Sequence, residues 1–202
     1  MTLEKKREFI KKYRNNIPQI LSSKFIADVD TPISALLKIS NKEKYSFLLE
    51  SVEGGKQRGR YSLLGYQPDL IWKIINGKVQ LKTSSNFLSN KINLNLSPLK
   101  SLRNILQHSK IHRSRKEPPY PILVGYLGYS MIQYMEKIIL KNPDPLNIPE
   151  AMFIRPKVAA VFDNIKDTIN IMTSVYPSKK IDAEEALNKA NSYINNAIKN
   201  FK

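Results

Sequence analysis

Residues Tyr45–Asp69 read Y-S-F-L-L-E-S-V-E-G-G-K-Q-R-G-R-Y-S-L-L-G-Y-Q-P-D, and this segment sets the expected architecture of the chain. Its two ends, Tyr45–Ser51 and Arg60–Gly65, are apolar runs rich in residues that favour β-strands. The residues between them are rich in glycine and charge. Two strand-like runs around such a turn predict a β-hairpin or a longer connection between two strands.

An acid and a hydroxyl, Glu50 and Ser51, stand at the end of the first run, where the pattern predicts the protein interior. A carboxylate removed from water needs a positive partner or hydrogen-bond donors. Arg58 and Arg60 lie nearby in the chain, and the residues alone favour an ion pair between Glu50 and Arg60 across the hairpin. The alternative is a contact between Glu50 and the amine of a small ligand.

The rest of the chain mixes helical patterns with further hairpins and has no βαβ rhythm. Asn76-Gly77 is the strongest two-residue hairpin signal in the sequence. Apolar periodicity predicts helices over 3–15, 33–39, 98–109, 129–139 and 181–201, and strands over 20–27, 68–75, 78–81, 151–163 and 168–175. This order predicts an α+β fold, in which helices pack on a mixed, mainly antiparallel β-sheet.

The composition narrows the class of protein. The chain has 202 residues with 42% apolar residues, enough for a substantial core, and it has no cysteine for disulfides or thiolate chemistry. The N-terminal residues mix charges with isolated apolar positions, unlike a secretory signal peptide. No apolar run approaches the roughly 20 residues of a membrane span. We therefore expect a cytoplasmic protein with no membrane partner.

The net charge of +16 admits two interpretations. One is a nucleic-acid-binding surface. The other is a lysine-rich composition without a specific role, and we favour it because the cations are scattered over Lys5–Arg14, Lys56–Arg60 and Lys110–Lys116 without interleaved aromatic residues. We therefore predict no nucleic-acid partner.

No catalytic constellation is visible in the sequence. His108 and His112 stand among lysines and arginines, no cluster has metal-ligand spacing, and we predict no metal site in this chain. Ser51 lacks the glycines and base of a nucleophilic serine. Asp163, in V-F-D-N, is expected to begin a turn. We predict no catalytic residue here.

Four motifs nevertheless occur in an informative order: D-T-P-I-S-A-L-L-K (30–38), L-L-E-S-V-E-G-G-K-Q-R-G-R-Y-S-L-L-G (48–65), V-G-Y-L-G-Y (124–129) and N-P-D-P-L-N-I-P-E-A (142–151). Together they resemble the N-terminal region of the anthranilate synthase component I family, within the chorismate-utilising enzymes. The resemblance covers roughly 28–177. Ser130 departs from it, because the family usually has aspartate there.

The resemblance implies a parent enzyme, a carbon-oxygen lyase that converts chorismate and ammonia or glutamine to anthranilate and pyruvate in the first step of L-tryptophan biosynthesis. It implies three parts: an N-terminal helix and lead-in strand (1–27), the regulatory domain (28–177) and a C-terminal helix leading toward an absent catalytic domain (178–202). The family's chorismate- and Mg²⁺-binding residues lie in that catalytic domain. The chain alone is thus expected to be inactive and to hold no cofactor, with Mg²⁺ and a glutamine amidotransferase subunit belonging to the full enzyme.

The resemblance also implies a binding site for L-tryptophan as feedback inhibitor, marked by L-L-E-S. Glu50 would pair with the ligand ammonium and Ser51 with its ammonium or carboxylate. Leu49 and Tyr61 would contact the indole, and Arg60 would neutralise Glu50 or the ligand carboxylate. Burying about 200 Å² of indole contributes about 5 kcal/mol. Because micromolar affinity needs about 8 kcal/mol, polar contacts must supply the remainder.

Three other functions stay open at this point. The N-terminal region of aminodeoxychorismate synthase component I shares the site, although the wording V-E-G-G and R-G-R-Y-S favours the tryptophan branch. A stand-alone tryptophan-binding module is a second alternative. A basic nucleic-acid-binding protein is the third.

Overall fold

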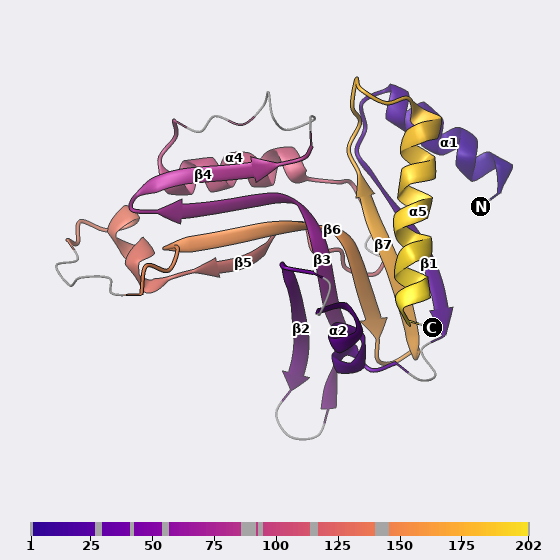
Figure 1. The fold of residues 1–202 in the computed structure, drawn as a ribbon, viewed down its shortest axis with the longest axis horizontal. Helices are drawn as coiled ribbons and strands as arrows, with labels where there is room; N and C mark the ends of the chain where they lie inside the picture. Colours follow the sequence, from indigo (N-terminus) through magenta and orange to yellow (C-terminus); the bar gives the residue numbers. More distant parts are fainter. Residues whose placement is uncertain are drawn as a thin grey trace. The chain divides into compact units, whose positions relative to one another are not determined.

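The computed structural model describes residues 2–26, 30–40, 43–53, 57–85, 92, 95–113, 117–139 and 146–201 (Figure 1). The elements in chain order are α1 (Leu3–Arg14), β1 (Gln19–Ile26), α2 (Pro32–Ser40), β2 (Ser46–Glu53), β3 (Gln57–Ile75), β4 (Lys78–Thr83), α4 (Pro98–Ser109), β5 (Val124–Leu127), the 3₁₀ helix η1 (Tyr129–Tyr134), β6 (Ala151–Asp163), β7 (Thr168–Val175) and α5 (Ala183–Phe201). The sheet order is β1-β7-β6-β3-β2, with β4 on β3 and β5 on β6. The strand registers are antiparallel, and the predicted α+β class is confirmed.

The chain divides into two compact units. Unit 1 comprises residues 1–68, 111–121 and 156–202, and unit 2 comprises 69–110 and 122–155. Strands β3 and β6 therefore each contribute residues to both units. The division into 1–27, 28–177 and 178–202 that the sequence suggests stays a prediction.

The core of unit 1 lies where α2 and α5 cover the sheet. Helix α5 runs along β7 and β1 (Figure 1) and presents one apolar stripe, from Ala183 through Ile194 to Phe201, to these strands. Ile194 packs in a cluster with Leu64 of β3 and Ile171 of β7. The 3.6-residue period of this stripe is the reason that the helix buries one face and leaves the other polar.

The core of unit 2 is built around Trp72, which is fully buried on β3. Its indole N–H donates to Ser101 Oγ of α4 at 2.9 Å, so the one polar atom of the ring is satisfied. Arg155 of β6 is also fully buried, and its guanidinium forms two hydrogen bonds, of 2.7 and 2.8 Å, with the carboxylate of Asp69. Its Nη1 donates to Ser109 Oγ at 3.2 Å.

The predicted elements are largely present, with two differences. Strand β3 continues through Pro68, where the sequence indicated two separate runs. Its pairing with β2 extends to Tyr66 and its pairing with β4 begins at Leu70, so Pro68 falls between these two partners, where its missing N–H interrupts neither ladder. The helix predicted over 129–139 is shorter, a 3₁₀ helix over Tyr129–Tyr134. None of the described helices is both long and apolar enough to cross a membrane.

Candidate functional site

The hairpin of β2 and β3 carries all five residues that the sequence singled out. In the register, Leu49 lies opposite Leu63 and Glu50 lies opposite Ser62. Partners across a ladder share a face and successive residues alternate, so Leu49 and Glu50 point to opposite faces of the hairpin. The register shifts between Glu50 and Val52, which places Ser51 at a β-bulge or similar irregularity. The side chain of Ser51 lies outside the described part of the protein.

The prediction that Glu50 lies in the interior is wrong. Glu50 is exposed, and Leu49 on the opposite face keeps 46% of its surface accessible. The reason is that, among the strands that the structure describes, β2 stands at one end of the sheet order and has a neighbour on one side only. An exposed carboxylate therefore stands next to an exposed leucine at an outer sheet edge.

Arg60 pairs with Asp163 of β6, rather than with Glu50 as the residues alone favoured. Its Nη2 lies 3.1 Å from Oδ2 and its Nε 3.3 Å from Oδ1 of this carboxylate, a two-point contact. The guanidinium carbon also lies 4.8 Å from the ring centroid of Tyr61. Arg60 is thus held by an acid on one side and an aromatic ring on the other.

The sequence predicted the turn at Asp163 but not its ion pair with Arg60. It begins the turn after β6, as predicted, and its Oδ1 accepts the N–H groups of Ile165 and Lys166, each at 3.3 Å. Burial alone raises the pKa of Asp163, but the hydrogen bond from Arg60, the turn N–H groups and the Arg60 charge outweigh it, so the pKa is lowered. The hydrogen bond to Asp163 in turn raises the pKa of Arg60.

A second polar network lies in unit 2, centred on Glu150. Its Oε1 accepts the backbone N–H of Gly77 at 2.7 Å, and its Oε2 accepts the hydroxyl of Tyr134 at 2.7 Å. Burial and then this hydrogen bond raise the pKa of Tyr134 to about 12. The network ties the β3–β4 turn to η1. Neither it nor the Asp69–Arg155 pair was predicted, although an arginine within the apolar run of β6 was a signal that a buried acid must face it.

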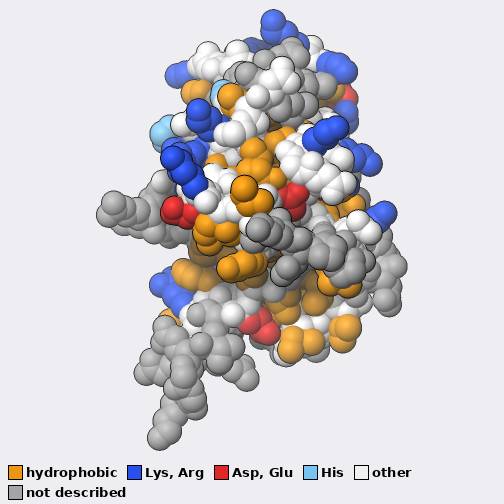
Figure 2. Space-filling view, turned by 90° about the vertical axis from the view of Figure 1, so that its left-hand side faces the viewer, with side chains coloured by type: hydrophobic (Ala, Val, Ile, Leu, Met, Phe, Trp, Pro, Cys, Tyr) orange, Lys and Arg blue, Asp and Glu red, His pale blue; other side chains and the backbone are white. Residues whose placement is uncertain are grey.

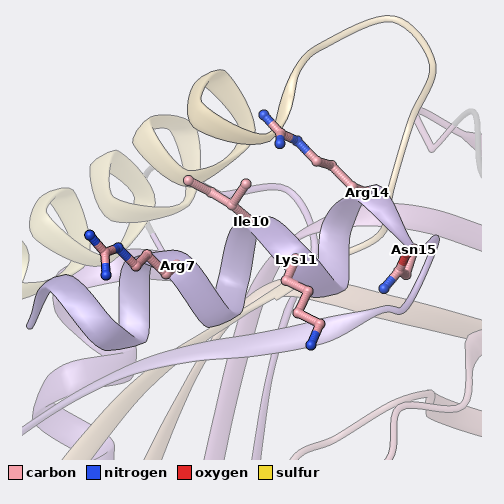
Figure 3. Close-up of a pocket in the computed structure, with 5 residues that line it drawn as sticks. All are labelled: Arg7, Ile10, Lys11, Arg14 and Asn15. Atoms are coloured by element: carbon pink, nitrogen blue, oxygen red, sulfur yellow. The ribbon is translucent and has the colours of Figure 1, made fainter.

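A hollow of about 490 Å³ lies along α1 in unit 1, lined by Arg7, Ile10, Lys11, Arg14 and Asn15 (Figure 3). All five side chains come from one helix and its C-terminal end, and Figure 3 shows Lys11 directed away from Arg7 and Arg14. The cations do not converge on one point, so the hollow lacks the geometry of a built anion site. Among the described residues, no three His, Asp or Glu side chains form a group that could hold a metal ion.

Comparisons with known proteins give close matches along most of the chain. Curated proteins named anthranilate synthase component 1 are 36% identical in Cereibacter sphaeroides over 91% of this chain, 33% in Thermus thermophilus over 80%, and 28% in Aquifex aeolicus over all of it. A crystal structure of anthranilate synthase component I from Streptococcus pneumoniae covers 85% of this chain and 36% of its own, with 24% identity and a TM-score of 0.48. No family model matches.

The lengths of these relatives differ greatly from that of the present chain. It spans 37% of the Cereibacter protein, 32% of the Thermus protein and 40% of the Aquifex protein. The matches therefore concern one part of a longer kind of polypeptide. On these sequence matches, the chain belongs to the anthranilate synthase component I family and corresponds to a part of its members.

Proposed function

We propose that this chain is the N-terminal regulatory region of an anthranilate synthase component I. The observation that carries the proposal is the 36% identity, over 91% of the chain, to a protein of that name. The parent enzyme would convert chorismate and ammonia or glutamine to anthranilate and pyruvate, the first step of L-tryptophan biosynthesis. Its partner would be a glutamine amidotransferase subunit. The chorismate- and Mg²⁺-binding residues would lie in the part of the relatives that this chain does not match, so the chain alone is inactive.

The regulatory ligand in this proposal is L-tryptophan, bound over the outer edge of β2. The exposed carboxylate of Glu50 is available to a ligand ammonium, and exposed Leu49 offers an apolar contact for the indole. Because these two side chains point to opposite faces, a ligand that touches both must lie across the edge of the strand rather than on one face. An edge strand also presents unpaired backbone donors and acceptors to such a ligand.

Because Arg60 pairs with Asp163, we propose a role for it other than neutralising Glu50 or the ligand carboxylate. Its charge is already balanced by an acid, so it is a weak partner for either Glu50 or the ligand carboxylate. We assign Arg60 the positioning of Tyr61, whose ring it covers, and leave Glu50 free for the ligand ammonium. Ser51 and the backbone of β2 would then bind the ligand carboxylate.

Calorimetry of the chain with L-tryptophan, against L-phenylalanine as the control ligand, tests this proposal. We expect L-tryptophan to bind and Ser51→Arg to abolish binding, because a long cation would fill the site beside the ammonium. Glu50→Ala should weaken binding with little loss of stability, since Glu50 is exposed. The matched control is Ser22→Arg, which makes the same change at an exposed serine on the other edge strand, β1. If Ser51→Arg binds L-tryptophan as tightly as the unaltered chain does, the binding site does not lie on β2.

The activity of the parent needs its own assay, on the enzyme that contains the missing region. The relatives reported above are all named for anthranilate synthase, which favours this branch over aminodeoxychorismate synthesis. We expect anthranilate as the product from chorismate, and inhibition by L-tryptophan. Formation of aminodeoxychorismate instead would replace this proposal by the folate-branch alternative.

A further inference from the structure

The turn between β3 and β4 holds the only Asn-Gly pair in the sequence. Ile75 pairs with Lys78, so Asn76 and Gly77 form a two-residue loop, and both loop residues are exposed. Their φ angles of 50° and 73° are those of a type I′ turn. Figure 2 faces the side on which this turn lies in Figure 1, and it shows acidic side chains beside hydrophobic and basic ones there.

An exposed Asn-Gly pair is open to deamidation, because glycine has no side chain to shield its backbone nitrogen. In this reaction the nitrogen of Gly77 loses its proton and forms a bond with Cγ of Asn76, and the side-chain amide nitrogen leaves as ammonia. Water then opens the resulting cyclic imide at one of its two carbonyl carbons. The product is an aspartate, or an isoaspartate whose backbone runs through the former side chain. Water is the only co-reactant.

The backbone of the type I′ turn keeps the two reacting atoms apart. The ψ angle of the first loop residue in such a turn is about +30°. At that angle the nitrogen of Gly77 lies nearly opposite to Cβ of Asn76 across the Cα–C bond, whereas the cyclic imide needs both on the same side. The type II′ turn, with ψ of about −120° at this position, provides that arrangement. The peptide between Asn76 and Gly77 must therefore turn over before the reaction.

Glu150 holds this peptide in its unreactive orientation. Its Oε1 accepts the N–H of Gly77 at 2.7 Å, and its Oε2 accepts the hydroxyl of Tyr134 at 2.7 Å. Its own N–H donates to the carbonyl of Ile74 at 2.9 Å, which fixes Glu150 to β3. The hydrogen bond to Gly77 breaks when the peptide turns over. The negative charge of the carboxylate also disfavours loss of the proton from the Gly77 nitrogen.

We propose that Asn76 is a deamidation site whose reaction Glu150 suppresses. The two products have different consequences for the turn. Asp-Gly also favours a type I′ turn, so the aspartate product keeps the two-residue loop. The isoaspartate product adds one carbon to the backbone of that loop, which breaks the type I′ geometry and the contact with Glu150. The inference depends neither on the family role nor on tryptophan binding.

The test follows the deamidation of the chain during incubation at mildly alkaline pH. Peptide mass spectrometry measures the mass increase at Asn76, and methylation by an isoaspartate methyltransferase identifies the isoaspartate. We expect the unaltered chain to react more slowly than a free peptide of sequence 72–80. Glu150→Ala should accelerate the reaction at least about tenfold, because the hydrogen bond to a charged group is lost. Glu136→Ala is the matched control, the same change at an exposed glutamate shortly after η1, and should not alter the rate.

A second variant separates the effect of Glu150 on the reaction from its effect on folding. Glu150→Gln keeps an acceptor for the N–H of Gly77 but removes the charge, so its rate should lie between those of the unaltered chain and Glu150→Ala. If Glu150→Ala changes the circular dichroism of the chain, Glu150→Gln decides alone. Equal rates in the deciding variant and the unaltered chain overturn the inference. It is also overturned if Asn76 in the unaltered chain reacts as fast as in the free peptide.

Discussion

The buried pair of Asp69 and Arg155 shows what single residues contribute to unit 2. Their side chains are 4% and 0% exposed, and two hydrogen bonds join them. Desolvating two charges offsets much of their attraction, so the pair adds little net stability, yet a lone partner would be very unfavourable. The arginine in β6 therefore makes sense only together with an acid from β3.

Asp69→Asn should lower the free energy of unfolding by about 3–5 kcal/mol, because it leaves the Arg155 charge buried without its counter-ion. The double variant Asp69→Leu/Arg155→Met should recover most of that loss, since apolar residues of similar volume replace the pair. Urea unfolding followed by tryptophan fluorescence measures both, because Trp72 lies in the same unit. A double variant as unstable as the single one would contradict this account.

Asp163 makes the stability of unit 1 depend on pH. Its pKa in the folded protein is lowered from its ordinary value of about 3.9. A lowered carboxyl pKa contributes stability that is present above the unfolded value and is lost as the pH falls through the folded value. Between about pH 4 and pH 2 the unaltered chain should therefore lose stability more steeply than Asp163→Asn. Denaturation at a series of pH values measures the slopes, and equal slopes would show that the Arg60 pair does not form in solution.

Among the elements, the contact of β5 with β6 depends most directly on one residue type. A Cβ added at Gly125 would overlap the carbonyl oxygen of Met152 and would lie 2.7 Å from Phe153 Cα. Both are backbone atoms of β6, which cannot turn aside as a flexible side chain would. The glycine is thus required for the two strands to approach at their observed register.

Gly125→Ala should detach β5 from β6 and accelerate hydrogen exchange at Val124–Leu127, with β7 unaffected. The control is Val124→Ala, which shortens a side chain on the same strand without adding an atom against β6. Hydrogen exchange followed by mass spectrometry separates the two strands. Unchanged protection in Gly125→Ala would mean that β6 can move away and that the glycine is not required.

The turn between β3 and β4 and the helix η1 are joined by one side chain, Glu150. The pKa of Tyr134 is raised to about 12 by burial and then by its hydrogen bond to Glu150. A raised tyrosine pKa contributes stability below the ordinary value of about 10, and this stability is lost as the pH rises through the folded value. Tyr134→Phe should cost about 1 kcal/mol at neutral pH and should remove one late step from the absorbance titration of the phenolates. A titration with no late step in the unaltered chain would contradict the contact.

The chain has a net charge of +16, and several of its described cations have acidic neighbours. Lys6 with Glu184, Lys12 with Glu8 and Lys189 with Glu185 are examples. The clusters of cations in the sequence form no strip in which cations alternate with aromatic residues, as a base-stacking surface would require. Attraction to an anionic polymer should consequently be weak and unspecific.

We expect fluorescence anisotropy with duplex DNA to show weak binding at low salt and none at physiological salt, since few cations would act together. The double variant Arg7→Ala/Arg14→Ala tests the basic hollow of α1 and should behave as the unaltered chain does. Tight binding at physiological salt with a steep salt dependence would restore the nucleic-acid alternative.

Local patterns were sufficient to predict most elements of this protein. Strands Ala151–Asp163 and Thr168–Val175, and helix Pro98–Ser109, occur at their predicted boundaries. Apolar periodicity and turn-forming residues act between residues that are near each other in the chain, so the sequence alone is enough to recognise them. The same holds for the motifs that carry the family resemblance, which the comparisons support.

Partner choice and exposure depended on contacts between distant parts of the chain. Arg60 binds an acid 103 residues away instead of the one across its own hairpin. Glu50 is exposed because β2 is an edge strand among the described strands, and the residue pattern of β2 does not reveal its place in the strand order. The spacing of apolar residues is a local property of the sequence. Which acid pairs with an arginine, and which residues are buried, is decided only when segments that are distant in the chain come into contact.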